Sequence, residues 1–185
     1  MIIRAADLPN PLFDAWRESN GVIGAADENQ RCYAWAIPSP EALETLAALA
    51  PIVEIGAGGG YWAHLLRELG VDIVCYDQAP PSLGFNGYAR RAFTHVQVGS
   101  PCSLMDHHQC TLFLCWPPMS KMARDAVQFF EGRRVVYVGE PYGGMTADDE
   151  FFDILEREFV ERSRIAIPQW RGHDDAMYIY ERKDT

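Results

Sequence analysis

The chain has 185 residues and a formal net charge of −10, because 26 acidic residues outnumber 16 basic ones. A hydrophobic content of 48% suffices for one folded core, and no apolar run reaches the ~18 residues that a membrane-spanning helix needs. Nucleic-acid binding draws most of its affinity from contacts between basic side chains and phosphates, so this charge argues against such a partner. We expect one soluble domain over residues 1–185, with no membrane or nucleic-acid partner.

The cysteine pattern argues against a disulfide framework or a metal site. The five cysteines make an odd count and contain no Cys-x-x-Cys pair. The first residues, Met1 to Asp7, lack the basic-then-apolar pattern of a secretory signal. The sequence therefore predicts a reduced, cytoplasmic protein without a bound metal.

Two short helices are predicted ahead of the first strand. Asn10-Pro11 supplies the N-cap and first-turn residues that begin a helix. Ser39-Pro40 begins a second helix in the same way. The polar stretch between them contains Tyr33 and Trp35, and we expect residues 1–38 to form an N-terminal helix and a lid.

From residue 51 onward, short apolar runs alternate with helical segments. The predicted strands cover residues 51–55, 71–76, 94–98, 111–115 and 135–138, and the helices among them cover 61–69 and 120–130. Residues 78–93 are rich in Pro, Gly and Ser and are expected to form a loop. Strands that alternate with helices form a parallel sheet with right-handed crossovers.

The last part of the chain departs from this alternation. Thr146-Ala147-Asp148-Asp149 resembles a capping box, a motif whose first residue caps the helix that follows, here over residues 151–159. Two further strands are predicted at 164–167 and 176–180, separated by a turn at 168–175. This spacing is too short for a crossover, so we expect the two strands to form an antiparallel hairpin.

A glycine cluster follows the first strand, in the run Glu54-Ile55-Gly56-Ala57-Gly58-Gly59-Gly60-Tyr61. Ligands of open α/β sheets bind at this edge, where the strands end. The dinucleotide fingerprint Gly-x-Gly-x-x-Gly would need its third glycine at Tyr61, whose ring is too bulky for close helix–strand packing. The spacing is instead Gly-x-Gly-x-Gly, with Glu54 two residues ahead. This carboxylate disfavours a pyrophosphate and suits a ligand that carries positive charge.

Asp77 ends the second predicted strand, roughly 20 residues past the glycine loop. An acidic side chain there can accept both ribose hydroxyls of an adenosine, whether in NAD or in S-adenosylmethionine. Asp77 therefore indicates a nucleoside without choosing between these ligands. The alternative interpretation is that Asp77 only caps the turn into Pro80-Pro81.

The run from Ile52 to Asp77, the alternation around it and the closing hairpin resemble the class I S-adenosylmethionine-dependent methyltransferases. The resemblance covers residues 40–185. It implies an α/β fold whose Rossmann-like, seven-stranded, mostly parallel sheet has the order 3-2-1-4-5-7-6, with helices on both faces and an antiparallel seventh strand. It also implies S-adenosyl-L-methionine as the cofactor, with Glu54 orienting its methionine end, Asp77 holding its ribose and Gln78 near its adenine. The implied cofactor contacts are Glu54, Gly56, Ala57, Gly58, Gly60, Tyr61, Asp77, Gln78, Cys115 and Trp116.

The sequence Trp116-Pro117-Pro118-Met119 follows the fourth predicted strand. It resembles the Asn/Asp-Pro-Pro-aromatic motif of amino-group methyltransferases, but Trp116 replaces the acidic or amide residue and Met119 replaces the aromatic one. The side-chain oxygen that would accept a target amine is absent, so methylation of nucleic-acid adenine is not implied. We interpret Trp116 as a wall for the cofactor or for an apolar substrate, with a buried core position as the alternative.

The remaining loops at the same edge supply candidates for the acceptor side. Methyl transfer is a displacement at an activated carbon, so catalysis is largely positioning, and a base is needed only for a protonated nucleophile. Glu140 and His173 are the candidate catalytic bases, and the alternative for Glu140 is a salt bridge with an arginine. The predicted substrate contacts are Tyr33, Trp35, Trp116, Tyr142 and Trp170.

Together these features predict an S-adenosylmethionine-dependent enzyme that methylates a small-molecule acceptor. Two alternatives stay open: a methyltransferase-like fold that serves as a non-catalytic binding module, and an NAD(P)-dependent oxidoreductase. The sequence identifies neither the acceptor nor its reacting atom, and it leaves the oligomeric state open.

Overall fold

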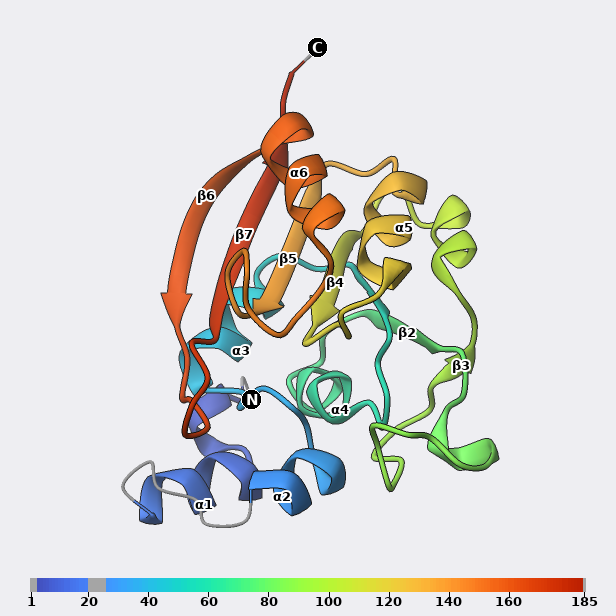
Figure 1. Ribbon diagram of the computed structural model, residues 1–185. Helices are drawn as coiled ribbons and strands as arrows, with labels where there is room; N and C mark the ends of the chain where they lie inside the picture. The colour runs from blue at the N-terminus through green and yellow to red at the C-terminus, as the bar shows by residue number, and fades with distance from the viewer. Residues whose placement is uncertain (1–2, 20–25, 185) are drawn as a thin grey trace.

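A computed structural model describes residues 3–19 and 26–184 of the chain. Its centre is a seven-stranded sheet in the order β3-β2-β1-β4-β5-β7-β6 (Figure 1). The strands are β1 (Ile52–Ile55), β2 (Ile73–Asp77), β3 (Gln97–Val98), β4 (Thr111–Cys115), β5 (Arg134–Gly139), β6 (Phe159–Ala166) and β7 (Ala176–Arg182). Strands β1 to β5 run parallel, and β7 is antiparallel to both β5 and β6. The expected fold class and strand order are confirmed.

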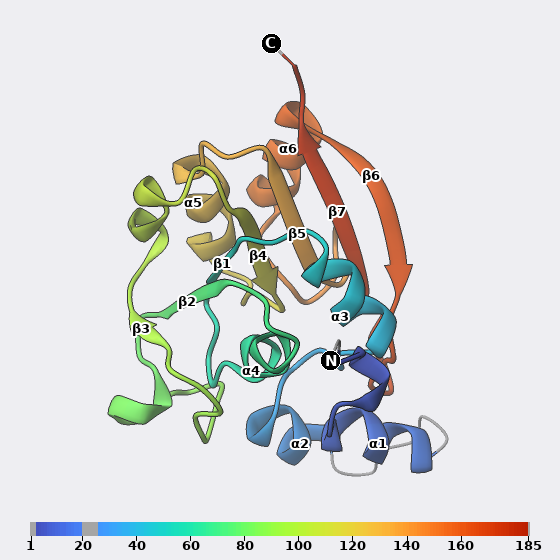
Figure 2. The ribbon, with the colours of Figure 1, turned by 180° about the vertical axis from the view of Figure 1, so that it is seen from behind.

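Helices cover both faces of this sheet. They are α1 (Pro11–Glu18), α2 (Ala26–Cys32), α3 (Pro40–Ala47), α4 (Tyr61–Glu68), α5 (Lys121–Phe129) and α6 (Asp149–Glu158), with 3₁₀ turns at Ala5–Asp7, Pro81–Leu83 and Pro101–Asp106. Figure 1 shows α5 and α6 on one face, and Figure 2 shows α3 and α4 on the other. The three layers bury both faces of the central strands.

Successive residues of a strand point to opposite faces, and the core divides accordingly. In β1, Ile52 packs in the cluster that contains α3 and α4, whereas Val53 and Ile55 pack in the cluster that contains α5 and α6. Glu54 alternates with Val53 and Ile55, so its carboxyl lies on the same face as α4. An ionisable group is thereby placed within an apolar layer.

Two of the predicted helix starts have the expected cap. The Asn10 side chain accepts a hydrogen bond from the Phe13 amide at the start of α1. The Ser39 hydroxyl accepts one from the Ala42 amide at the start of α3. Each bond satisfies an amide that has no partner within its own helix.

The predicted cap of α6 is wrong. Asp148, and not Thr146, accepts the hydrogen bond from the Phe151 amide. Thr146 is buried, and its hydroxyl accepts a hydrogen bond from the Glu140 amide at 2.9 Å. The loop after β5 uses that hydroxyl to satisfy a buried amide, so the cap of the helix lies two residues later, at Asp148.

The edge strands and the N-terminal region also differ from the predictions. Strand β6 begins at Phe159, whereas the prediction began it at residue 164. The first part of the strand was missed because residues 160–164 are exposed at the sheet edge and lack the apolar pattern of a buried strand. Strand β3 is shorter than expected, and α2 forms in a stretch that was expected only to be polar. Residues 20–25 of the predicted lid lie outside the described residues.

The carboxyl ends of the parallel strands point toward the N-terminal helices, and Figure 1 shows α1 and α2 beyond this edge. The loops that follow β1, β2 and β4 therefore meet the N-terminal segment there. In an open α/β sheet this edge is where a ligand binds. Within the described residues, every helix is too short or too polar to cross a membrane.

Candidate functional site

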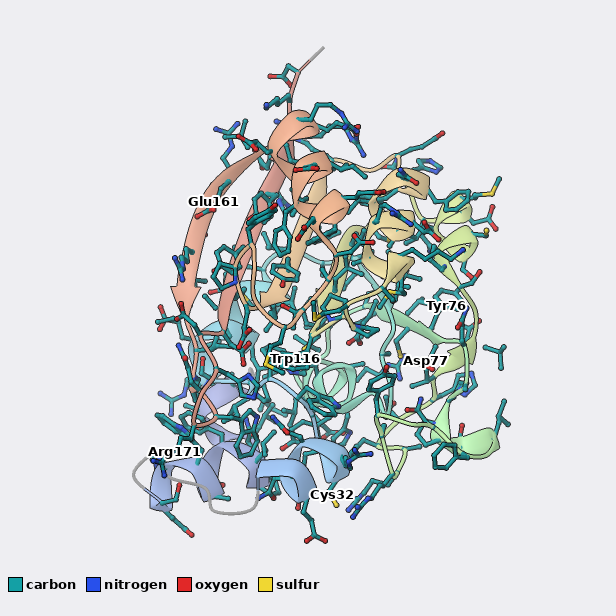
Figure 3. The ribbon with its side chains drawn as sticks, viewed as in Figure 1. Cys32, Tyr76, Asp77, Trp116, Glu161 and Arg171 are labelled. Carbon is teal, nitrogen blue, oxygen red and sulfur yellow. The ribbon has the colours of Figure 1, made fainter. Side chains whose placement is uncertain are left out.

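A cavity of about 340 Å³ opens at the carboxyl ends of β1, β2 and β4. Its volume falls within the usual range for small-molecule sites, roughly 300–1,000 Å³. The described lining includes the predicted site residues Tyr33, Trp35, Glu54, Gly56, Ala57, Gly58, Tyr61, Asp77, Gln78, Cys115 and Trp116. Figure 3 shows Asp77 and Trp116 at this edge of the sheet.

The glycine loop between β1 and α4 has a backbone that glycine adopts without strain. Gly56, Gly58 and Gly60 have φ angles of +77°, +54° and +70°. Gly59 is needed for space, because a Cβ at this position would lie 2.2 Å from the carbonyl oxygen of Arg91. The loop is therefore packed tightly against the chain segment that follows β2.

Amides of this loop are already used inside the chain. Gly56 and Ala57 both donate to the carbonyl oxygen of Tyr76, at 2.9 and 3.0 Å. Gly58 donates to Oδ2 of Asp77 at 2.8 Å. A diphosphate cradle presents free amides to its ligand, and at these three positions the loop has none to present.

Asp77, at the end of β2, holds the loops on either side of it. Its Oδ1 accepts hydrogen bonds from the Ala79 amide at 2.8 Å and from Nδ2 of Asn86 at 3.3 Å. Asp77 therefore caps the turn after β2, as the alternative interpretation held, and it also lines the cavity. Among the described residues, its Oδ2 accepts a hydrogen bond only from the Gly58 amide, so a lone pair on this oxygen stays available to a ligand hydroxyl.

Glu54 lines the same cavity with only 2% of its surface exposed. Its Oε2 has no hydrogen-bond partner among the residues that the structure describes. Burial raises the pKa of this carboxyl to about 8, and the nearby Arg67 only partly opposes that effect. Desolvation disfavours the charged form of this side chain, so its burial favours the protonated acid in the ligand-free protein.

Trp116 and Cys115 form the wall of the cavity at the end of β4. Trp116 has a left-handed backbone, with φ of +50°, and its Nε1 donates to Oδ1 of Asp175 at 2.9 Å. Its ring stacks on Trp35 at a centroid distance of 4.9 Å. Burial raises the pKa of the Cys115 thiol well above its usual range, so this side chain is an uncharged part of the wall.

The N-terminal segment is fastened to the loop after β2 by three hydrogen bonds, which we call the latch. The Arg90 amide donates to the Arg31 carbonyl oxygen at 2.8 Å. Nη1 of Arg31 donates to the Gly87 carbonyl oxygen at 3.0 Å, and Nε1 of Trp35 donates to the Tyr88 carbonyl oxygen at 3.0 Å. Segments that are distant in the sequence therefore meet beside the cavity. The role of residues 1–38 as a lid that opens and closes stays a prediction.

Gln30, Asn86 and Tyr88 are among the lining residues that were not predicted from the sequence. Asn86 shapes its own loop, since its Oδ1 accepts hydrogen bonds from the amides of Tyr88 and Ala89 at 2.7 and 2.9 Å. Asn86-Gly87 is a turn-forming pair and was the available signal for this loop. Gln30 lies on α2, whose polar sequence carries no comparable signal.

Glu140 and His173, the two candidate bases, are paired with each other. Oε1 of Glu140 lies 2.9 Å from Nδ1 of His173, and Oε2 accepts the Met145 amide at 2.6 Å. Although burial opposes it, these hydrogen bonds lower the pKa of Glu140. The alternative prediction, a salt bridge between Glu140 and an arginine, is wrong, because Glu140 pairs with His173. Neither residue lines the cavity; the imidazole touches Trp116 edge-on at 5.3 Å and lies 3.5 Å from Nε2 of Gln30.

Three other predicted contacts lie outside the cavity lining, and their placement is corrected. Tyr142 is 63% exposed on the loop after β5. Trp170 is buried in the core, where its indole N–H donates to the Trp35 carbonyl oxygen at 2.7 Å and supports the cavity wall from behind. Gly60 begins α4 and faces the side chain of Val96.

Comparison with known proteins gives likeness at the level of fold. No protein-family model and no curated protein sequence matches the chain. A structure from work on the conversion of a disulfide bond into a thioacetal group during echinomycin biosynthesis aligns with a TM-score of 0.52 and 15% identity, over 94% of this chain and 93% of that one. Streptococcus pneumoniae Sp1610, described as a tRNA (m1A22) methyltransferase and bound to S-adenosyl-L-methionine, aligns with a TM-score of 0.51 and 14% identity, over 78% and 73%. Magnesium protoporphyrin IX methyltransferase from Synechocystis PCC 6803, with the same cofactor bound, aligns with a TM-score of 0.50 and 13% identity, over 92% and 91%.

These identities are too low to transfer an activity or an acceptor. The neighbours share with this chain the arrangement of the sheet and its helices. In this chain that arrangement has the strand order β3-β2-β1-β4-β5-β7-β6, with β7 antiparallel. The chain has the fold of the class I S-adenosylmethionine-dependent methyltransferases.

Proposed function

We propose that the protein binds S-adenosyl-L-methionine in this cavity and transfers its methyl group to a small molecule. The observation that carries the proposal is the presence, in one cavity, of Asp77 and of an unpartnered Oε2 on Glu54. A carboxylate at the end of β2 suits the ribose of a nucleoside. A buried acidic oxygen without a partner suits a positively charged group.

The charge of the lining favours this ligand over a dinucleotide. The described residues of the lining include no lysine, arginine or histidine. A diphosphate would therefore meet two acidic side chains without a basic partner, whereas a sulfonium or an ammonium group would meet its complement. The internal hydrogen bonds of the Gly56, Ala57 and Gly58 amides support the same choice.

The residues present can hold each part of S-adenosylmethionine. We assign the ribose to Asp77, the adenine to the neighbourhood of Gln78, and the methionine end to Glu54. The glycine loop would lie beneath the ligand. Helix α4 has no side-chain cap, so its first amides are available to the ligand carboxylate.

Bound S-adenosylmethionine would supply a methyl group on a positively charged sulfur, which is already activated for displacement. The protein's part is to exclude water and to hold the acceptor in line with that methyl group. The stacked rings of Trp35 and Trp116, together with the latch, would shield the cavity. For an acceptor that must lose a proton, we propose His173 as the base, oriented by Glu140 at 2.9 Å from Nδ1. His173 lies outside the cavity lining, beside Trp116 and Gln30, so this role requires Gln30 to move aside.

The acceptor is proposed to be a small molecule because both the whole chain and the cavity are acidic. The formal net charge is −10, which disfavours a polyphosphate backbone. The two cofactor-bound neighbours are named for different acceptors, a tRNA and a porphyrin. The fold therefore does not choose an acceptor, and the charge of this chain supports the small-molecule class.

Thermal denaturation with S-adenosylmethionine, S-adenosylhomocysteine and NAD⁺ tests the proposal. A ligand at 100 times its dissociation constant stabilises a protein by about 2.7 kcal/mol. We expect both sulfur compounds to raise the melting temperature and NAD⁺ to leave it unchanged. Asp77→Ala should lose the shift, whereas Asp153→Ala, on the exposed side of α6, should keep it. No shift with either sulfur compound, or a larger shift with NAD⁺, would contradict the proposal.

A further inference from the structure

Glu54 combines two features that seldom occur together. Its side chain lines a ligand-sized cavity, and yet only 2% of the residue is exposed. Within the described part of the chain, its Oε2 has no hydrogen-bond partner. A buried carboxylate oxygen without a partner is costly, and the cost falls if the group keeps its proton or receives a positive charge.

Arg67 of α4 is the basic group that acts on Glu54, but its guanidinium is used elsewhere. Nη2 donates to the carbonyl oxygen of Ile73 at 2.9 Å, and Nη1 donates to the carbonyl oxygen of His95 at 3.0 Å. The arginine therefore fastens β2 to the chain before β3 and makes no described hydrogen bond to Glu54. Its charge only partly offsets the effect of burial on the pKa of Glu54.

The other ionisable groups that face Glu54 do not stabilise its charge. Asp77, at the end of β2, repels a negative charge on Glu54 and so raises its pKa. Cys75 of β2 lies beside Glu54 in the parallel register, and burial raises the pKa of its thiol to about 12. Cys115 of β4 is likewise an uncharged thiol, because burial raises its pKa. Without a ligand, Glu54 therefore has no counter-charge within reach that is free to pair with it.

We propose that Glu54 makes the cavity selective for a cationic ligand: it is an uncharged acid in the free protein and releases its proton to solvent when the positive charge of the ligand enters. This inference rests on the proposed function, because the ligand charge is that of S-adenosylmethionine. The step is an exchange in which the Glu54 O–H bond breaks, the proton passes to buffer, and the carboxylate pairs with the bound cation. A neutral adenosyl ligand gives no such exchange and gains nothing from Glu54.

Calorimetric titration in buffers with different ionisation enthalpies counts the protons released on binding. The ligands are S-adenosylmethionine and 5′-methylthioadenosine, which shares the adenosine and the sulfur but carries no ammonium or sulfonium group. At pH 6.5, we expect the wild type to release close to one proton more than Glu54→Gln when S-adenosylmethionine binds. The variant also accounts for any titration of the ligand's own amino group, whose ordinary pKa is near 8. Asp153→Asn should release the same number as the wild type.

The two ligands separate failure of this inference from failure of the proposed function. If S-adenosylmethionine binds and the proton count is equal in the wild type and Glu54→Gln, the inference is wrong and the proposed function stands. If methylthioadenosine releases as many protons as S-adenosylmethionine, charge selection is also wrong. If neither ligand binds the wild type, the proposed function and the inference fall together. Should Glu54→Gln not fold, infrared spectra of the wild type decide, since binding must remove one protonated-carboxyl band.

Discussion

The Gly58 amide donates a 2.8 Å hydrogen bond to Oδ2 of Asp77, so the glycine loop and the end of β2 are fastened to each other. This contact joins the two parts of the sequence from which a nucleoside site was predicted. The same oxygen is the one proposed to bind the ribose. The geometry of the loop and the proposed recognition of the ligand therefore depend on one carboxylate.

Asp77→Asn should weaken the binding of S-adenosylhomocysteine. The amide keeps the shape of the side chain but loses the charge that strengthens its hydrogen bonds, and a hydrogen bond to a charged group is worth about 1.5–3 kcal/mol. We expect the dissociation constant to rise roughly 10- to 100-fold, measured by isothermal titration calorimetry. Asp153→Asn is the matched control on α6, and an equal loss in both variants would remove Asp77 from the site.

Gly59→Ala should destabilise the fold and the ligand site together. The added Cβ would lie 2.2 Å from the Arg91 carbonyl oxygen, and the backbone at this contact also carries the hydrogen bond from the Phe93 amide to Gly59, at 2.8 Å. Overpacking of this kind costs about 1–3 kcal/mol. Urea denaturation measures the loss in the free energy of unfolding.

Gly87→Ala is the control for this steric effect, because nothing lies within 4 Å of a Cβ at Gly87. Its free energy of unfolding should stay within about 0.5 kcal/mol of the wild type, as for most surface substitutions. Equal destabilisation of the two variants would show that the packing of the glycine loop is not as tight as the structure indicates.

The free energy of unfolding of the ligand-free protein should fall as the pH rises from about 4.5 to about 8, the span over which burial has raised the pKa of Glu54. The unfolded chain ionises this carboxyl at low pH, whereas the folded chain keeps it protonated. The unfolded state therefore binds fewer protons in this window, and stability decreases with pH. Asp175 adds a similar decline between about 3.8 and 6, because burial raises its pKa also.

Urea denaturation of the wild type and of Glu54→Gln at pH 5.5 and pH 8 checks this dependence. Glutamine does not titrate, so the variant should lack the decrease in the free energy of unfolding that Glu54 contributes between these two pH values, on the order of a few kcal/mol. Asp153→Asn should keep the wild-type slope. A slope that is the same in Glu54→Gln and the wild type would mean that Glu54 is already ionised in the folded protein.

Trp35→Phe should make the bound ligand leave faster. The substitution removes the indole N–H that donates to Tyr88 in the latch and keeps an aromatic ring against Trp116. A hydrogen bond of this kind contributes about 0.5–1.5 kcal/mol, so the dissociation rate of S-adenosylhomocysteine should rise roughly 2- to 10-fold. Surface plasmon resonance measures that rate.

Trp16→Phe provides the matched control for the latch variant. Trp16 lies on α1, and its buried Nε1 has no partner among residues 3–19 and 26–184, so the substitution removes no described hydrogen bond. Its ligand dissociation rate should equal that of the wild type. If Trp16→Phe accelerates dissociation as much as Trp35→Phe does, the latch does not retain the ligand.

The fold could be predicted in large part from the sequence, because its signals are local. Strand β4 has the predicted bounds. Four of its five residues are buried, as expected for a central strand of the sheet. Strand β6 was predicted too short, because an exposed edge strand needs no apolar pattern. The cap of α6 was misplaced because Thr146 bonds to a buried amide of another segment, a contact that no local motif reports.

The residues of the candidate site were likewise predicted only where their signal is local. Glu54 and Asp77 were found because the glycine loop fixes their spacing within one strand–helix–strand unit. Gln30 and Tyr88 were missed because the fold, and not the sequence spacing, brings α2 and the loop after β2 to the cavity. The raised pKa of Glu54 could not be predicted, because desolvation depends on every layer packed around the side chain, which the sequence does not display.

The central claim is that this cavity binds an adenosyl-methionine ligand between Asp77 and Glu54. A crystal structure of the protein with S-adenosylhomocysteine tests it most directly. We expect a ribose hydroxyl within hydrogen-bond distance of Oδ2 of Asp77 and the amino-acid end of the ligand beside Glu54. Electron density for the ligand at any other place, or no density at saturating concentration, would contradict it.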